Sequence, residues 1–183
     1  MSDDLFILVR ADGSVSEQVF VPTGSSPSEL GQLPDGLTEY PIDRFGEPWE
    51  DFVPGTGWVA NMTLLRAIKW EAVKAKRTEV QTGGCNTPSG RAQTDLESLG
   101  LINGAVTMAI LSLQASAPYS IEFTLADNTS IALDAAGMIA LGQAVGIFIA
   151  VSHARSVALR AAIDAAADPA ALDAIDIESG WPT

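Results

Sequence analysis

The sequence is poor in the side chains from which catalytic and metal sites are usually built. Its 183 residues include one cysteine, Cys85, and one histidine, His153. A single cysteine excludes an internal disulfide, and a metal site around one histidine would need acidic co-ligands that show no recognisable spacing. A Ser-His-Asp triad lacks the Gly-x-Ser-x-Gly elbow that would present its nucleophile. The sequence therefore predicts no catalytic residue, no metal ligand and no cofactor.

Positive charge is also scarce. Ten Lys and Arg oppose 23 Asp and Glu, which gives a formal net charge of −13. Such a surface repels phosphate backbones and anionic lipid headgroups, so we expect no nucleic-acid binding. The acidic excess is explained by solubility at high concentration, with an acidic docking face as the alternative.

The chain lacks a long unbroken hydrophobic run. The longest, residues 138–151, contains Gln143 and is shorter than the roughly 20 residues that span a bilayer. The start, MSDDLF, is acidic and has no basic segment followed by an apolar one, so no signal peptide is expected. The sequence predicts a buried helix, no membrane association and synthesis in a cytoplasm.

What the sequence does contain is 47% hydrophobic residues, enough for a core, and a first segment of distinct character. In residues 1–60, LFILVR and SVSEQVFV are joined across Asp12-Gly13, which is typical of a β-hairpin. We expect a loop at 23–36, a strand at LTEYPI, and a second hairpin turning at Pro54-Gly55. We therefore expect residues 1–60 to form a small β-rich interaction module. Because so small a unit buries little core by itself, it should pack against the rest of the chain or against a partner.

From residue 61 onward the pattern is helical. Asn61 is expected to cap a helix that runs to about Thr82. One face is expected to carry Leu65, Ile68, Ala72 and Ala75. The helix also holds half of the basic residues, namely Arg66, Lys69, Lys74, Lys76 and Arg77. We expect them to pair with acidic neighbours or with another subunit, and a nucleic-acid contact is the alternative.

The segment TGGCNTPSGRAQ ends this helix. Its glycines have the wrong spacing for a phosphate-binding loop, so we expect a turn between helices, with Cys85 as an incidental loop cysteine. Thr94-Asp95 then open a second helix. Its expected core stripe is Leu99, Ile102, Val106, Ala109 and Leu113.

A hairpin is predicted near residues 120–133, because SIEFT and SIALD flank the turn ADNT. Asp134 is expected to cap a third helix reaching Ala166, whose first half is apolar on all sides and should be the most buried element. Asp168 should cap a last short helix with Leu172 facing inward. The predicted fold class is α+β, with a small N-terminal β module followed by a mainly helical domain, residues 61–183, that carries one β-hairpin.

Large aromatic residues are the candidate packing or interface anchors, namely Trp49, Phe52, Trp58 and Trp181. Core or inter-subunit packing is the expected role of tryptophan, and carbohydrate binding is the alternative. Trp181 stands near the end of the chain, where it is expected to fasten the terminus. Truncating it would then cost about 3–5 kcal/mol. The alternative is a terminus offered to another protein.

Four segments occur in a familiar order: IKWEAVKAKRTEVQTGG, GRAQTDLES, FTLADNTSIALDAAGMIALGQAV and DPAALDAIDIESGWP. Together they resemble a domain of unknown function found in bacteriophage tail-fibre and tail-associated proteins. Two positions depart from that pattern: Ala92 or Gln93 stands where an aromatic residue is usual, and Ile121 or Phe123 where a tryptophan is usual. The family has no established catalysis, so the resemblance supplies no active-site residues.

The resemblance implies a structural virion protein, associated with the tail or baseplate and serving as a tail-fibre or fibre-adaptor protein. Its expected partners are other tail, baseplate or fibre proteins. The chain is also expected to assemble with copies of itself, as a trimer. A tail-fibre assembly chaperone that is absent from the mature virion is the alternative function. A carboxylate-dependent hydrolase is a further alternative, because two of the many acidic residues could form the pair of carboxylates that glycosidases use.

Overall fold

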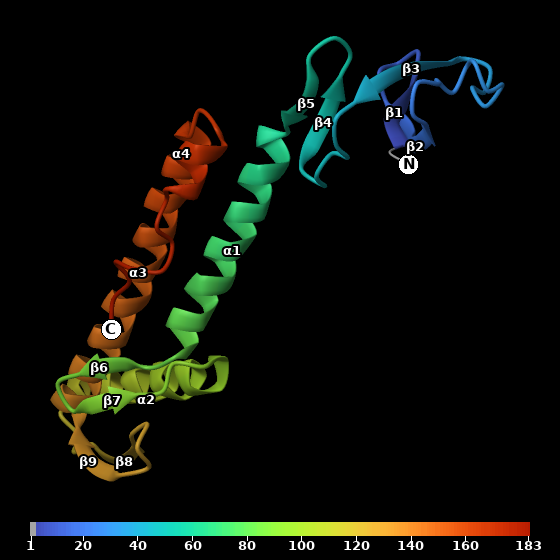
Figure 1. Ribbon diagram of the computed structural model, residues 1–183. Helices are drawn as coiled ribbons and strands as arrows, with labels where there is room; N and C mark the ends of the chain where they lie inside the picture. Colours follow the sequence, from blue (N-terminus) through green and yellow to red (C-terminus); the bar gives the residue numbers. More distant parts are fainter. Residues whose placement is uncertain (1–2) are drawn as a thin grey trace. The chain divides into compact units, whose positions relative to one another are not determined.

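The computed structural model describes residues 3–183. Their backbone contacts separate into two compact units, one ending at Ala67 and the other beginning at Ile68. The sequence predicted the change of character at residue 60, just before helix α1 (Met62–Thr82) begins. Each unit is described by itself (Figure 1). The observed order, small strands and hairpins followed by a mainly helical region, confirms the predicted α+β class.

The N-terminal unit is built from five short strands: β1 (Asp3–Arg10), β2 (Val15–Pro22), β3 (Leu37–Ile42), β4 (Glu50–Val53) and β5 (Gly57–Ala60). Strands β2, β1 and β3 form an antiparallel sheet in that order, and β4 pairs with β5. Both predicted hairpins and the predicted strand at LTEYPI are confirmed. Residues 23–36 form turns and loop, as expected.

Strand β1, the middle strand of the sheet, is buried along three consecutive residues. Ile7, Leu8 and Val9 are all nearly inaccessible, although neighbouring side chains in a strand point to opposite faces. Ile7 and Val9 share a small core with Phe52 from the β4–β5 hairpin. Both faces of the central strand are therefore covered, which explains the uninterrupted apolar run LFILV.

The second unit combines the rest of α1 with two short hairpins and three more helices: β6 (Cys85–Thr87), β7 (Gly90–Ala92), α2 (Leu96–Gln114), β8 (Ser120–Thr124), β9 (Ser130–Asp134), α3 (Ala135–Ala165) and α4 (Pro169–Asp173). The predicted helix caps are confirmed. Asp95 accepts hydrogen bonds from the backbone N–H groups of Glu97 and Ser98, and Asp134 accepts one from Gly137. The hairpin predicted near residues 120–133 is confirmed as β8–β9.

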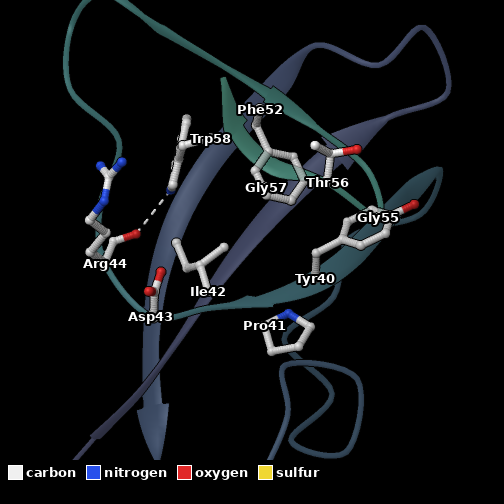
Figure 2. A pocket seen from close by; sticks show the side chains of 10 residues that line it. All are labelled: Tyr40, Pro41, Ile42, Asp43, Arg44, Phe52, Gly55, Thr56, Gly57 and Trp58. Atoms are coloured by element: carbon white, nitrogen blue, oxygen red, sulfur yellow. Dashed lines mark hydrogen bonds between the residues drawn. The ribbon is translucent and has the colours of Figure 1, made fainter. Parts of the chain in front are cut away.

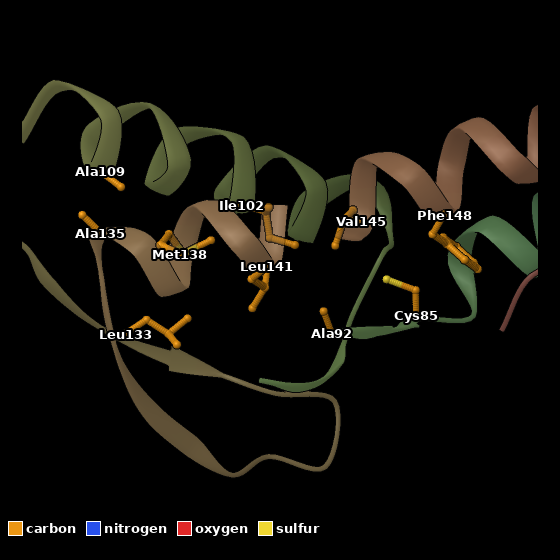
Figure 3. Close-up of a cluster of buried hydrophobic side chains, with 10 residues drawn as sticks. All are labelled: Cys85, Ala92, Ile102, Ala109, Leu133, Ala135, Met138, Leu141, Val145 and Phe148. Carbon is orange, nitrogen blue, oxygen red and sulfur yellow. The ribbon is translucent and has the colours of Figure 1, made fainter. Parts of the chain in front are cut away.

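The main core lies where α2 crosses α3. Figure 3 shows Ile102 and Ala109 of α2 directed towards Met138 and Leu141 of α3. Cys85 from the β6–β7 hairpin completes this cluster. The buried residues of α3 recur every three or four positions along its length, which is the spacing of one helical face.

Four sequence predictions about this unit were wrong in detail. The segment expected to be only a turn contains the β6–β7 hairpin, and Cys85 is fully buried in the core instead of lying in an exposed loop. The face of α1 expected to be apolar is largely exposed, with Ile68 at 53%, whereas Val73 is the residue that is buried. The end of the α2 stripe, Leu113, is exposed.

Gly142 permits the close approach of α2 and α3. A Cβ atom built at Gly142 would collide with Cγ2 of Val106 on α2. Valine has little rotamer freedom in a helix, so it does not turn aside easily. Glycine normally weakens a helix interior, and its presence here is explained by this packing contact.

We predict that Gly142→Ala lowers the free energy of unfolding by about 1–3 kcal/mol, because the added methyl group overpacks the α2–α3 contact. Gly146→Ala is the matched control in the same helix: open space surrounds its Cβ position, so it should be neutral or stabilising by up to about 1 kcal/mol. Adding Val106→Ala to Gly142→Ala should restore part of the loss. Urea denaturation measures all three, and an equal effect of both glycine substitutions would refute the packing explanation.

Candidate functional site

An aromatic cluster lines an open pocket of about 620 Å³ in the N-terminal unit (Figure 2). The ring centroids of Tyr40 and Phe52 are 5.5 Å apart, and those of Phe52 and Trp58 are 5.4 Å apart with the rings nearly perpendicular. The indole N–H of Trp58 donates a hydrogen bond of 3.0 Å to the carbonyl oxygen of Arg44. The cluster therefore joins β3, the β4–β5 hairpin and the segment between them.

The pocket edge is held by an ion pair that the sequence analysis missed. Both terminal nitrogens of Arg44 lie 2.7 Å from the carboxylate oxygens of Glu50, which gives two parallel hydrogen bonds. Glu50 also accepts a hydrogen bond from the backbone N–H of Glu47. The Arg44 hydrogen bonds, followed by the one from Glu47, lower the pKa of Glu50 to about 2. No spacing rule links residues 44 and 50 in an irregular segment, so the pair had no sequence signal.

Other aromatic side chains of this unit face solvent. Phe20 is 57% exposed and meets Phe45 edge to face, with ring centroids 4.9 Å apart. Trp49 is also exposed. Of the predicted anchors, Phe52 is therefore buried in the small core, Trp58 is half-buried beside it, and Trp49 is available for contact. Exposed aromatic groups of this kind are typical anchors of protein interfaces.

The fourth predicted anchor, Trp181, lies in the C-terminal tail of the second unit. Its indole N–H donates to the carbonyl oxygen of Ile177 at 2.9 Å, and the side chain is half-buried. Arg155 of α3 donates to the carbonyl oxygens of Asp176 and Ser179, both at 3.0 Å. The role of Arg155 was not expected, because a basic residue on an alanine-rich helix gives no sign that it binds backbone carbonyls.

The tail also contacts α1 and returns along α3 (Figure 1). Lys76 lies 3.0 Å from Glu178 and 3.1 Å from Glu79. These two carboxylates, Glu178 first, raise the pKa of Lys76. The expectation that basic residues of α1 pair with acidic neighbours is confirmed for Lys76 and for Lys74, which pairs with Glu71.

A third surface is formed by α2 and β8. A groove of about 730 Å³ runs between them, lined on one side by Leu101 and Met108 and on the other by Ile121 and Phe123. By length and composition alone, α2 and α3 are apolar enough to cross a membrane, a property that the core helices of many water-soluble proteins share. One face of α2 packs on α3, and the other carries large exposed apolar residues.

The polar chemistry of the described residues is that of turns, caps and ion pairs. Carboxyl groups whose pKa departs clearly from the usual value are Asp12, Glu39, Glu50, Asp95, Asp127 and Asp176, and all are lowered. Hydrogen bonds from nearby Ser, Thr or Arg side chains are the main cause in each case. Burial raises the pKa of the Cys85 thiol. Within residues 3–183 no group of three or more His, Cys, Asp or Glu residues could hold a metal ion.

The pairing of Glu50 predicts a pH-dependent stability. The folded pKa of about 2 lies below the ordinary value of 4.5, so the stabilisation is present above about pH 4.5 and is lost as the pH falls towards 2. Glu50→Gln should therefore lower the melting temperature of the full-length protein at pH 7, and its difference from the wild type should shrink as the pH falls through 2. Asp51→Asn, at an exposed neighbouring position, is the control and should have little effect at either pH. A pH-independent effect of Glu50→Gln would contradict the ion-pair explanation.

The half-burial of Trp181 reduces the loss expected on truncation. About half of an indole surface, at about 25 cal/mol/Å², gives roughly 1–3 kcal/mol for Trp181→Ala, less than the 3–5 kcal/mol expected for full burial. Trp181→Phe, which keeps the ring but loses the hydrogen bond to Ile177, should recover most of it. Chemical denaturation checks both values. Unchanged stability in Trp181→Ala would show that this residue serves a partner instead of the tail.

Comparison with known proteins places the second unit in a family. The profile of a family described as "Domain of unknown function (DUF4376)" matches residues 65–178, more than half of the chain. Comparisons with curated proteins and with solved structures gave no match. The matched range includes every strand and helix of the second unit and excludes the sheet and aromatic cluster of the first. The chain therefore belongs to the DUF4376 family of domains of unknown function.

Proposed function

We propose that this protein is a structural, non-catalytic component of a bacteriophage tail, associated with the tail or baseplate as a tail-fibre or fibre-adaptor protein. The observation that carries the proposal is that both units expose large apolar side chains. Phe20, Phe45 and Trp49 are exposed in the first, and Leu101 and Met108 in the second. Permanent assemblies cover such patches, which are costly on a free protein. The assignment to phage tails rests on the ordered resemblance of residues 68–182.

The two units suit a connecting role. The DUF4376 unit has its own core, its own capped helices and a fastened tail, while the aromatic groups of the N-terminal unit lie outside the family match. A chain with two separate units can bind one neighbouring protein through each unit and so connect the two in an assembly. The proposed partners are other tail, baseplate or fibre proteins and further copies of the chain, with neither nucleic acid nor a membrane, and the proposed location is the virion after synthesis in the host cytoplasm.

The tail-fibre assembly chaperone is the second candidate, because the groove beside α2 would equally shelter an apolar segment of an unfinished fibre. Mass spectrometry of purified particles distinguishes the two. A structural component is retained at a fixed copy number, for which we expect a multiple of three. Presence in infected-cell extract but absence from particles would establish the chaperone instead. A hydrolase would show saturable turnover of a glycan or ester that a single carboxylate substitution abolishes.

The exposed aromatic groups supply a specific test of attachment. Phe20→Ser/Trp49→Ser should leave folding intact, because both side chains are exposed, and should remove the protein from particles. Leu30→Ser, an exposed apolar residue of the loop at 23–36, is the control and should be incorporated normally. Melting temperature and particle composition are measured together. Normal incorporation of the double variant would exclude these aromatic groups as the attachment surface.

A further inference from the structure

The exposed side of α2 carries a straight apolar strip along the helix. Leu101, Gly104, Met108 and Leu111 follow one another at spacings of three and four residues, and the three larger side chains are 67%, 56% and 51% exposed. We call these four residues the α2 strip. Alternating steps of three and four place all four on one side of a helix, the pattern by which one helix packs along another. The opposite side of α2, at Ile102 and Ala109, is already buried against α3.

We propose that the α2 strip is the contact through which copies of this chain associate, α2 against α2. The inference deepens the proposed structural function and rests on it for the biological setting. The spacing of the strip indicates that its partner is a helix. Because the strip has no charged residue, the contacting face of that helix should also be uncharged. Glu97, at the start of α2, is the one charged residue of the helix. The α2 strip of a second copy meets both conditions.

The charge of the chain also favours this surface. Each copy has a formal charge of −13, so two copies repel one another over most of their surfaces. The α2 strip carries no charge, and Glu122 is the one charged residue that lines the groove beside it, so contact there brings few like charges together. Closed cyclic symmetry then covers the same strip on every copy, without leaving one exposed.

A bilayer is a less suitable occupant. Residues 92–154, which include all of α2 and the first part of α3, contain no lysine or arginine. Membrane helices are commonly oriented and anchored by basic residues at their ends, and acidic chains are repelled by anionic lipid. One side of α2 is packed on α3, whereas a single membrane-spanning helix would be surrounded by lipid on all sides.

Gly104 in the strip and Gly100 beside it are consistent with a close neighbour outside the chain. A Cβ atom at Gly100 or Gly104 would meet no heavy atom within 4 Å, so no contact within the described chain requires glycine at either position. Both glycines line the groove between α2 and β8, together with Leu101 and Met108. Side chains of a second α2 helix can enter this groove where the two helices meet.

The test compares two double variants of the full-length protein by sedimentation over a range of concentrations. Met108→Lys/Leu111→Lys places charge on the strip and should reduce the sedimenting mass to that of one 19.1 kDa chain. Ile147→Lys/Val157→Lys changes two similarly exposed residues of α3 and should leave the oligomer intact. A monomeric wild type at high concentration, an oligomeric α2 variant, or dissociation of the α3 control would each overturn the proposal.

Cross-linking covers the case in which the charged α2 variant fails to fold. Cys85 is the only cysteine and is fully buried, so a new surface cysteine is the reactive one. Met108→Cys should form covalent dimers on mild oxidation, and Val157→Cys should remain monomeric under the same conditions. No covalent dimer from Met108→Cys would overturn the proposal.

Two further measurements separate this inference from its alternatives. Binding of the wild type to vesicles containing phosphatidylcholine and phosphatidylglycerol, lost in Met108→Lys/Leu111→Lys, would replace self-association by a membrane contact. Particle composition tests the proposed function separately. A chain that self-associates through α2 but is absent from particles would retain this inference and refute the virion assignment.

Discussion

The packing of α2 against α3 is the contact on which the second unit depends. It buries Ile102 and Ala109 of one helix against Met138 and Leu141 of the other, and it also brings the β6–β7 hairpin into the core through Cys85. Because α3 continues well beyond this crossing, the rest of its buried side remains available to α1 and the C-terminal tail. One long helix thus organises the second unit through successive contacts along its length.

The sequence predicted elements well where a local rule governs the structure. Asp95 and Asp134 are caps because a short acceptor side chain satisfies the free N–H groups at a helix start, whatever the surrounding fold. Hairpins with an Asp-Gly or Asp-Asn turn between alternating apolar residues were equally clear. The α+β class followed from the order of these elements.

Predictions failed where the outcome depends on which neighbour an element meets. Helix α1 has apolar residues on more than one side. The spacing of apolar residues predicted burial of the side that carries Ile68, whereas contacts in the folded unit bury Val73. Cys85 lies in a glycine-rich segment that resembles a loop, yet pairing with Ala92 places it in the core. The candidate site was predicted only in part: aromatic residues indicated where contacts would gather, but the Arg44–Glu50 pair had no pattern to reveal it.

The fastened tail has a consequence for the order in which the molecule is completed during translation. Lys76 and Glu178, which lie near opposite ends of the sequence of the second unit, form an ion pair. Arg155 donates hydrogen bonds to the carbonyl oxygens of residues 176 and 179. These contacts can form only after residues 176–179 have left the ribosome, whereas the N-terminal sheet is complete once Ile42 has emerged. A chain that stops before residue 176 lacks the contacts that join this segment to α1 and α3, so its second unit is left without this closure.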